Sequence, residues 1–200
     1  MLSDNEALSA RFDTRWLYAL RCSLVGLAVG IFWRHYAEVR KPYRLQSNRL
    51  LGSIALGVLV FMFWIQLDLG WLSFGESNGF VPLAADGDLL WIHVIPRLIG
   101  AAILVPVIEE LFWRAFLMRW LENPEFLIVE PAKIRFKVLL VSSVIFALEH
   151  NLWFAGLLAG LVYGGLYIRT GNLWYPIIAH ATTNGILGLW VIHTGNWQFW

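Results

Sequence analysis

Six residues able to carry acid–base chemistry lie in three short clusters within apolar segments of the chain. They are Glu109, Glu110 and Arg114 in the first cluster, His150 in the second, and His180 and Asn184 in the third. A carboxylate can take a proton from water, while a histidine or an amide can donate a hydrogen bond to the oxyanion that forms on a carbonyl group. These residue types together predict acid–base hydrolysis.

The spacing within each cluster suggests a division of roles. Glu110 and Arg114 are four residues apart, so on a helix they share a face and can form an ion pair. Glu109 is rotated by about 100° from Glu110 and can face a cavity as a general base. His180 and Asn184 also share a helix face, as do Phe146 and His150. A structural salt bridge is the simpler explanation of the first cluster, but it would need one acid and not two.

Composition indicates a polytopic membrane protein. The 200 residues are 58% hydrophobic and 14% charged, well below the roughly 25% charged residues of soluble domains. The formal net charge is +1, so no excess of basic residues is present to neutralise phosphates, and nucleic acid is not expected as a partner. Cys22 is the single cysteine, which excludes an intramolecular disulfide framework. Asp4, Glu6 and Asp13 precede the first apolar run, unlike the basic start of a signal peptide, so we expect the N-terminus to be retained.

The apolar runs predict an all-α transmembrane bundle of about six membrane segments. They cover roughly residues 16–35, 49–68, 97–121, 137–150, 152–168 and 173–193. Because Pro96 and Pro106 interrupt a longer apolar stretch, we place the third span after Arg97 and interpret 88–96 as an interfacial lead-in. Residues 1–200 are then a single membrane domain, with N-terminal spans and an outer loop in 1–96 and a catalytic core in 97–193.

Loop charges predict the orientation in the membrane. The 34–49 connection carries one acid, Glu38, and five basic residues: Arg34, Arg40, Lys41, Arg44 and Arg49. The 68–88 connection carries four acids and no lysine or arginine. By the positive-inside rule the first connection is cytoplasmic and the second lies outside, as do both chain ends. At about 1.5 Å per residue, the three polar clusters then fall at similar depths, about 10–20 Å from the cytoplasmic ends of their helices.

Small and aromatic residues flank the clusters. Gly156, Gly160 and Gly164 recur every four residues, a spacing that lets membrane helices approach closely. We therefore expect segment 152–168 to pack tightly against the helices that carry the site. Trp153 and Trp174 are candidates to line a substrate groove.

At these residues the chain resembles the CPBP family of membrane proteases, which includes type II CAAX prenyl endopeptidases and bacteriocin-processing and immunity proteins. The family pattern is EExxxR, then FxxxH, then HxxxN or HxxxD, and all three parts occur here in order, with the resemblance extending over about 97–193. Ala115 stands where many members have glycine. The stretch from Trp113 to Leu121 is similar to CAAX protease-related proteins of bacterial exosortase systems.

The resemblance implies an intramembrane glutamate-type endopeptidase that works without metal or another cofactor. It implies that Glu109 and His150 activate a water, that His180 and Asn184 stabilise the oxyanion, and that Glu110 and Arg114 support them. It further implies a membrane-associated protein or peptide substrate, with a lipid-modified or C-terminal sorting segment, cut near the surface of a bacterial inner membrane.

Two other functions remain open. Two histidines and one acid are a known catalytic-zinc set, so His150, His180 and Glu109 could belong to a zinc-dependent membrane hydrolase. A non-catalytic membrane adaptor or immunity protein could instead retain the motif for stability. A transporter is the least favoured class because the polar groups form one cluster and no internal repeat is visible.

Overall fold

The computed structural model describes residues 14–40, 44–75 and 79–200. Asp4, Glu6, Asp13, Lys41 and Glu76, which entered the expectations about the N-terminus and loop charge, lie outside the described residues. The described chain is helical throughout apart from its connections and one isolated bridge between Leu83 and Leu89, which confirms the predicted all-α class.

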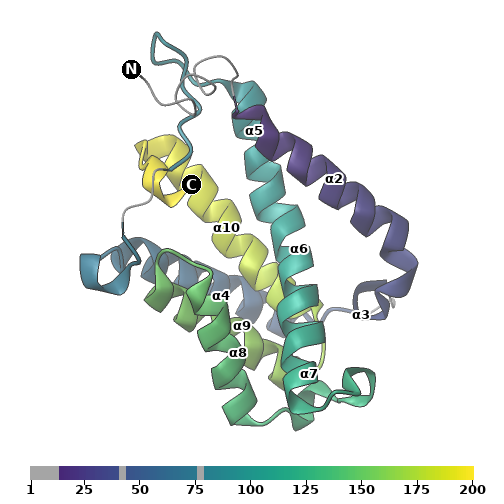
Figure 1. Cartoon of the computed structure of the whole chain (residues 1–200). Coiled ribbons are helices and arrows are strands. Elements are labelled where there is room, and N and C mark those ends of the chain that lie inside the picture. The colour runs from purple at the N-terminus through teal and green to yellow at the C-terminus, as the bar shows by residue number, and fades with distance from the viewer. Residues whose placement is uncertain (1–13, 41–43, 76–78) are drawn as a thin grey trace, which may run out of the picture.

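Five helices and one longer composite helix form the bundle. The five are α2 (Trp16–Phe32), α4 (Ser47–Gln66), α8 (Phe136–Leu148), α9 (Trp153–Thr170) and α10 (Trp174–Thr194). The composite helix consists of α5 (Trp91–Ile99), α6 (Val105–Glu110) and α7 (Arg119–Glu122), joined by the wider helical turns Gly100–Leu104 and Leu111–Met118. A one-turn helix, α3 (Ala37–Arg40), follows α2, and 3₁₀ turns cover Trp33–His35, Gly70–Leu72, Phe126–Ile128, Pro131–Lys133 and Trp197–Phe199. The starts of α2 and α5 and the end of α10 lie at one end of the molecule, and α7 lies at the other (Figure 1).

The third predicted span begins earlier than expected. A continuous helix runs from Trp91 to Glu122, so the placement of its start after Arg97, with 88–96 as a separate lead-in, was wrong. Pro96 lies in the second turn of α5 and removes a single backbone hydrogen bond, because proline has no N–H. Membrane helices tolerate this loss when a neighbouring group donates a hydrogen bond to the carbonyl left without a donor. At 1.5 Å per residue this helix is about 48 Å long, which exceeds the roughly 30 Å hydrocarbon core of a bilayer.

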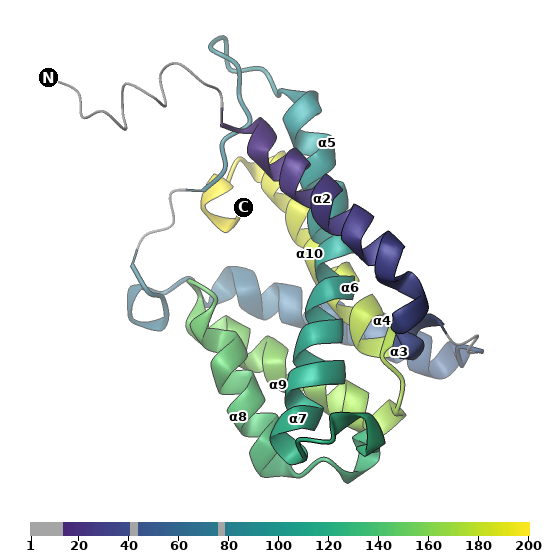
Figure 2. The ribbon, with the colours of Figure 1, turned by 45° about the vertical axis from the view of Figure 1, so that its right-hand side comes forward.

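Three helical segments of the described chain are long and apolar enough to cross a membrane, judged by length and composition. They are Trp16–His35, Ser47–Gln66 and Trp91–Glu122, and α8 is a shorter apolar helix. The segments expected at 152–168 and 173–193 are present as α9 and α10. In both ribbon views α8 and α9 lie side by side, and α4 runs crosswise behind them (Figure 2).

Close glycine contacts fix the helices that surround the site. A Cβ atom at Gly160 of α9 would lie 2.9 Å from the Cα of Ser143 in α8, and one at Gly57 of α4 would lie 2.3 Å from the carbonyl oxygen of Ala179 in α10. Neither position has room for a side chain. The expected tight packing of the glycine-spaced helix is therefore confirmed, and its neighbour is α8, the helix that leads into His150.

Candidate active site

A local change of helical register presents a backbone carbonyl to one site residue. Residues Gly100–Leu104 form a wider turn in which the N–H of Val105 donates to the oxygen of Gly100, five residues earlier. In this register the next donor would be residue 106 and its acceptor Ala101, but proline has no N–H. The Ala101 oxygen instead accepts a hydrogen bond of 2.9 Å from Asn184 Nδ2 in α10. Such wide turns occur frequently at functional sites.

Glu110 joins Arg114 to His180. Its Oε1 atom accepts hydrogen bonds from Arg114 Nη1 at 3.0 Å and from His180 Nδ1 at 2.9 Å, and the side chain is fully buried. The predicted ion pair is therefore confirmed, whereas sequence reasoning missed the bond to His180. Arg114 Nη2 also approaches the Gly160 carbonyl oxygen at 3.4 Å. An ionised carboxylate can only accept, so Nδ1 of His180 carries the hydrogen and Nε2 is left for another partner.

Glu109 faces a separate space. It lines an inner cavity of about 220 Å³ together with His150, His180 and Asn184. Its Oε2 atom is buried and has no hydrogen-bond partner among the described residues. The structure thus brings together the four residues expected to touch a substrate, and it holds Glu110 behind them.

His150 lies in the turn after α8, where its neighbours fix the ring. Nδ1 lies 2.8 Å from the Phe146 carbonyl oxygen, so it donates to that oxygen and Nε2 remains free. The rings of His150 and Phe146 lie 4.5 Å apart, and Trp64 of α4 meets the His150 ring edge-on at 5.4 Å. Glu149 is exposed and follows the last residue of α8.

Tyr163 holds the His180 ring from the other side. The two rings stack at 4.9 Å with an interplanar angle of 19°. The Tyr163 hydroxyl donates to Thr183 Oγ1 at 2.7 Å, and Thr183 in turn donates to the Gly57 carbonyl oxygen at 2.8 Å. Sequence reasoning did not identify this support, since a tyrosine in an apolar helix carries no distinctive pattern.

Comparison with known families adds an assignment for this part of the chain. A family model described as type II CAAX prenyl endopeptidase Rce1-like matches residues 91–186. This segment is similar to the type II CAAX prenyl endopeptidase family. Comparisons with curated proteins and with solved structures gave no significant match. The matched range contains all six predicted site residues, and the long apolar helices of the described chain are those of an integral membrane protein.

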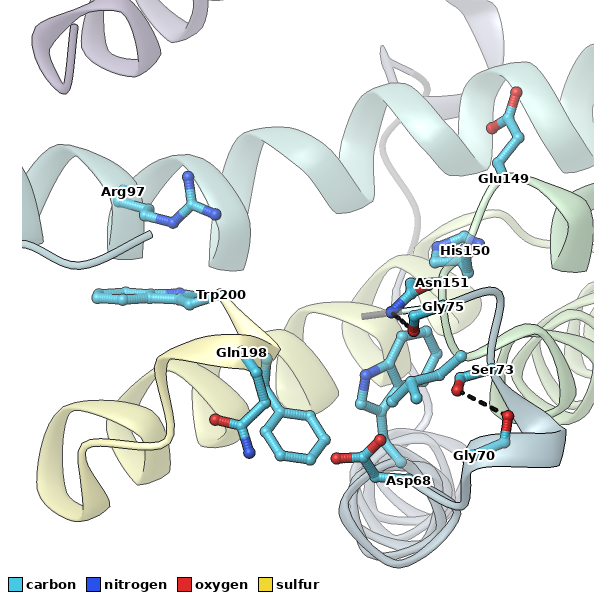
Figure 3. Close-up of a pocket in the computed structure, with 13 residues that line it drawn as sticks. Asp68, Gly70, Ser73, Gly75, Arg97, Glu149, His150, Asn151, Gln198 and Trp200 are labelled. Carbon is cyan, nitrogen blue, oxygen red and sulfur yellow. Dashed lines mark hydrogen bonds between the residues drawn. The ribbon is translucent and has the colours of Figure 1, made fainter. Parts of the chain in front are cut away.

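The CAAX-protease-like site opens toward a larger outer cavity of about 950 Å³ (Figure 3). The two cavities share five lining residues: Trp64, Arg97, His150, Phe199 and Trp200. Trp153 and Trp174, predicted to line a substrate groove, line neither of these two cavities. Trp64 and Trp200 line both cavities, because α4 and the segment after α10 fold over the site. No local sequence pattern encodes this long-range arrangement.

Metal-ligating side chains are not gathered in this CAAX-protease-like site. Among the described residues, no group of three or more His, Cys, Asp or Glu side chains is arranged to hold a metal ion. His150 and His180 nevertheless both have Nδ1 engaged and Nε2 free, which is the state that a zinc-binding histidine adopts. Metal content is therefore a question for direct measurement.

Proposed function

We propose that the protein is an intramembrane glutamate-type endopeptidase that hydrolyses a peptide bond near the membrane surface. The observation that carries this proposal is the position of Glu109, which lines the same cavity as His150, His180 and Asn184, whereas Glu110 does not line it. Glu110 is held by Arg114 and His180, while no hydrogen bond from another described side chain occupies Glu109 Oε2.

In the proposed reaction, Glu109 accepts a proton from a water molecule as that water attacks the scissile carbonyl carbon. His150 accepts a second hydrogen bond from the water through Nε2, since its Nδ1 hydrogen is occupied by the Phe146 carbonyl. Collapse of the tetrahedral intermediate breaks the C–N bond, and the proton held by Glu109 passes to the leaving amine.

His180 and Asn184 are the proposed oxyanion donors. One N–H of the Asn184 amide is used by Ala101, which leaves its second N–H for the substrate. With Nδ1 bonded to Glu110, His180 donates through Nε2 in its imidazolium form. The Arg114 guanidinium beside Glu110 limits the cost of burying that carboxylate.

The proposed substrate is a membrane-associated protein or peptide with a lipid-modified or C-terminal sorting segment, and the proposed location is the inner membrane of a bacterium. The outer cavity of about 950 Å³ supports a substrate longer than a single residue, because it adjoins the inner cavity at His150. Trp64, Phe199 and Trp200 in its lining can contact apolar side chains of such a substrate.

A Glu109→Gln variant tests this function. The substitution keeps the size of the side chain but removes its capacity as a base, so proteolysis should fall at least about 100-fold while the protein still folds. Membranes from cells that express wild-type protein, Glu109→Gln or Glu125→Gln should be compared by mass spectrometry of peptide termini. Glu125 is exposed in the connection after α7 and serves as the matched control.

The expected result is a set of termini that appears with wild-type protein and with Glu125→Gln but is absent with Glu109→Gln. Activity of folded Glu109→Gln within about tenfold of wild type would refute the assignment. If wild-type protein generates no new termini, and Glu109→Gln still supports the biological process, the adaptor function is favoured instead.

A further inference from the structure

A third cavity lies away from the active site, between α2 and α3 on one side and the composite helix on the other. Its volume is about 470 Å³, which is within the usual range for small-molecule sites. Val29 of α2 and Ile108, Leu111 and Phe112 of the composite helix form an apolar wall. The cavity shares no lining residue with the inner or the outer cavity, so the proposed reaction does not use it.

This cavity exists because α2 diverges from the composite helix. Near the start of α2 the two are in close contact, since a Cβ atom at Gly100 would lie 2.5 Å from Cys22 Sγ. One turn further along the same face of α2, a Cβ atom at Gly26 would be 3.9 Å from Leu104, and at Gly30 it would have no neighbour within 4 Å. Figure 1 shows the two helices separating from α5 toward α3. Both segments are long and apolar enough to cross a membrane, so the space between them faces lipid.

Basic side chains gather where the opening is widest. Arg119 lines the cavity and pairs with Glu38, which lines it too and anchors α3 to the composite helix. Arg34 and Arg40 are exposed, lie within two residues of cavity-lining residues, and take part in no ion pair among the described residues. Because Glu38 compensates Arg119 alone, this end of the cavity carries a net positive charge.

We infer that the third cavity binds one anionic phospholipid, with its phosphate at Arg34 and Arg40 and an acyl chain along the apolar wall. The charges are complementary, because the phosphate is negative and the two guanidinium groups are not neutralised within the protein. A zwitterionic lipid has the same chains but carries a cationic group that weakens this attraction. The positive-inside rule places the same end in the cytoplasmic leaflet, where basic segments meet anionic lipids.

A lipid in this place would support a helix that has few contacts of its own. None of the residues of α2 is buried, and its contacts with α5 and with the turn Gly100–Leu104 belong to its first half. A bound acyl chain would fill the space beside the second half. Binding should therefore raise the temperature at which the purified protein unfolds, since a ligand of the folded state stabilises it.

The full chain in detergent is suitable for the test. The probes are phosphatidylglycerol and phosphatidylcholine with identical acyl chains, with native mass spectrometry to count bound lipids and thermal unfolding at rising lipid concentration to measure affinity. We expect a single phosphatidylglycerol, bound about 5- to 30-fold more tightly than phosphatidylcholine, the effect of one or two basic side chains near a head group. Combining Arg34→Gln with Arg40→Gln should remove this preference, and the corresponding pair of lysine substitutions should keep most of it.

A second variant tests the apolar part of the cavity. Ala37 lines the cavity and is exposed, so Ala37→Trp can occupy the space without straining the core and should weaken both lipids. Lys137→Gln combined with Arg169→Gln is the matched control for charge, because both residues are exposed and line none of the three cavities. The control should keep the affinity for phosphatidylglycerol within about twofold, as expected for surface substitutions.

Three results would overturn the inference. Equal affinity of the wild-type protein for the two lipids would exclude recognition of the phosphate, as would an equal loss of preference in the control. Many lipids bound with no effect of Ala37→Trp would indicate only the general lipid belt. Competition by glycerol 3-phosphate as strong as that by the whole lipid would indicate a site for a free phosphate. Unfolding of each variant in lipid-free detergent checks its folding, and none of these measurements depends on proteolysis.

Discussion

Two adjacent glutamates of one helix have separate environments. Glu110 is fully buried and bonded through Oε1 to Arg114 and His180, whereas Glu109 lines the inner cavity. The four-residue spacing predicted the Glu110–Arg114 pair, because helix geometry alone fixes which residues share a face. The bond to His180 could not be predicted, since it joins residues seventy positions apart and depends on how α10 packs against α6.

Arg114→Ala should affect folding more than chemistry. The substitution leaves Glu110 buried without its counter-charge, and breaking a buried pair in this way costs about 3–5 kcal/mol. Thermal unfolding in detergent measures this loss. Arg135→Ala is the matched control, because Arg135 is exposed and its pair with Glu122 should contribute at most about 1 kcal/mol. An Arg114→Ala protein as stable as wild type but inactive would instead give Arg114 a direct part in the reaction.

At the scale of the helix, proline has a different role from the one that the sequence suggested. Pro96 and Pro106 were interpreted as interruptions, but the helix continues through both of them. Pro106 leaves the Ala101 oxygen without a backbone donor, and Asn184 of α10 occupies that oxygen. The prediction from sequence considered only the backbone N–H that proline lacks. It did not consider the Ala101 carbonyl oxygen that is left free as a result, whose hydrogen-bond donor comes from another helix.

Pro106→Ala should therefore reduce activity without reducing stability. The new N–H can donate within the helix and compete with Asn184 for the Ala101 oxygen, so the amide loses a hydrogen bond of about 1 kcal/mol that orients it. A loss of about 1 kcal/mol in transition-state stabilisation corresponds to a roughly fivefold fall in kcat/KM, which is the effect that we expect. The measurement is peptide cleavage together with thermal unfolding of the same samples.

Pro96→Ala is the control for that experiment, since Pro96 lies in the same helix but frees no carbonyl known to hold a site residue. Its activity should stay within about twofold of wild type. Equal losses in the two variants would indicate a general effect of helix straightening and would contradict a specific role for Pro106.

For the molecule as a whole, composition and apolar runs were sufficient to predict an all-α membrane bundle, and the ordered motifs were sufficient to predict which side chains meet. Glu109, His150, His180 and Asn184 do line one cavity. The shape of the substrate path could not be predicted in the same way. Trp64, Arg97 and Trp200 reach the site from α4, α5 and the segment after α10, and only the assembled fold brings them together.

The metal content of the purified protein should follow from the reaction proposed for it. With Glu109 as base and His180 and Asn184 as oxyanion donors, hydrolysis needs no cation, and an amide is a poor zinc ligand beside histidine and carboxylate. Elemental analysis should find no stoichiometric zinc, and activity should survive chelation. About one zinc per chain, lost together with activity in His150→Ala or His180→Ala, would show that the histidines are ligands.

The pairing of Glu110 with Arg114 inside one helix bears on how the chain enters the bilayer during synthesis. An arginine cannot shed its charge in lipid, whereas a carboxylic acid can be neutralised by a proton. Glu110 lies one helical turn from Arg114. It can therefore neutralise the charge of the arginine as soon as segment 91–122 is helical, before α10 has been made. Glu109 can enter as the neutral acid. The proposed hydrolytic site needs His150 and His180 from later segments and is complete only once α10 has been made, so under this proposal a partly inserted chain cannot cut its neighbours.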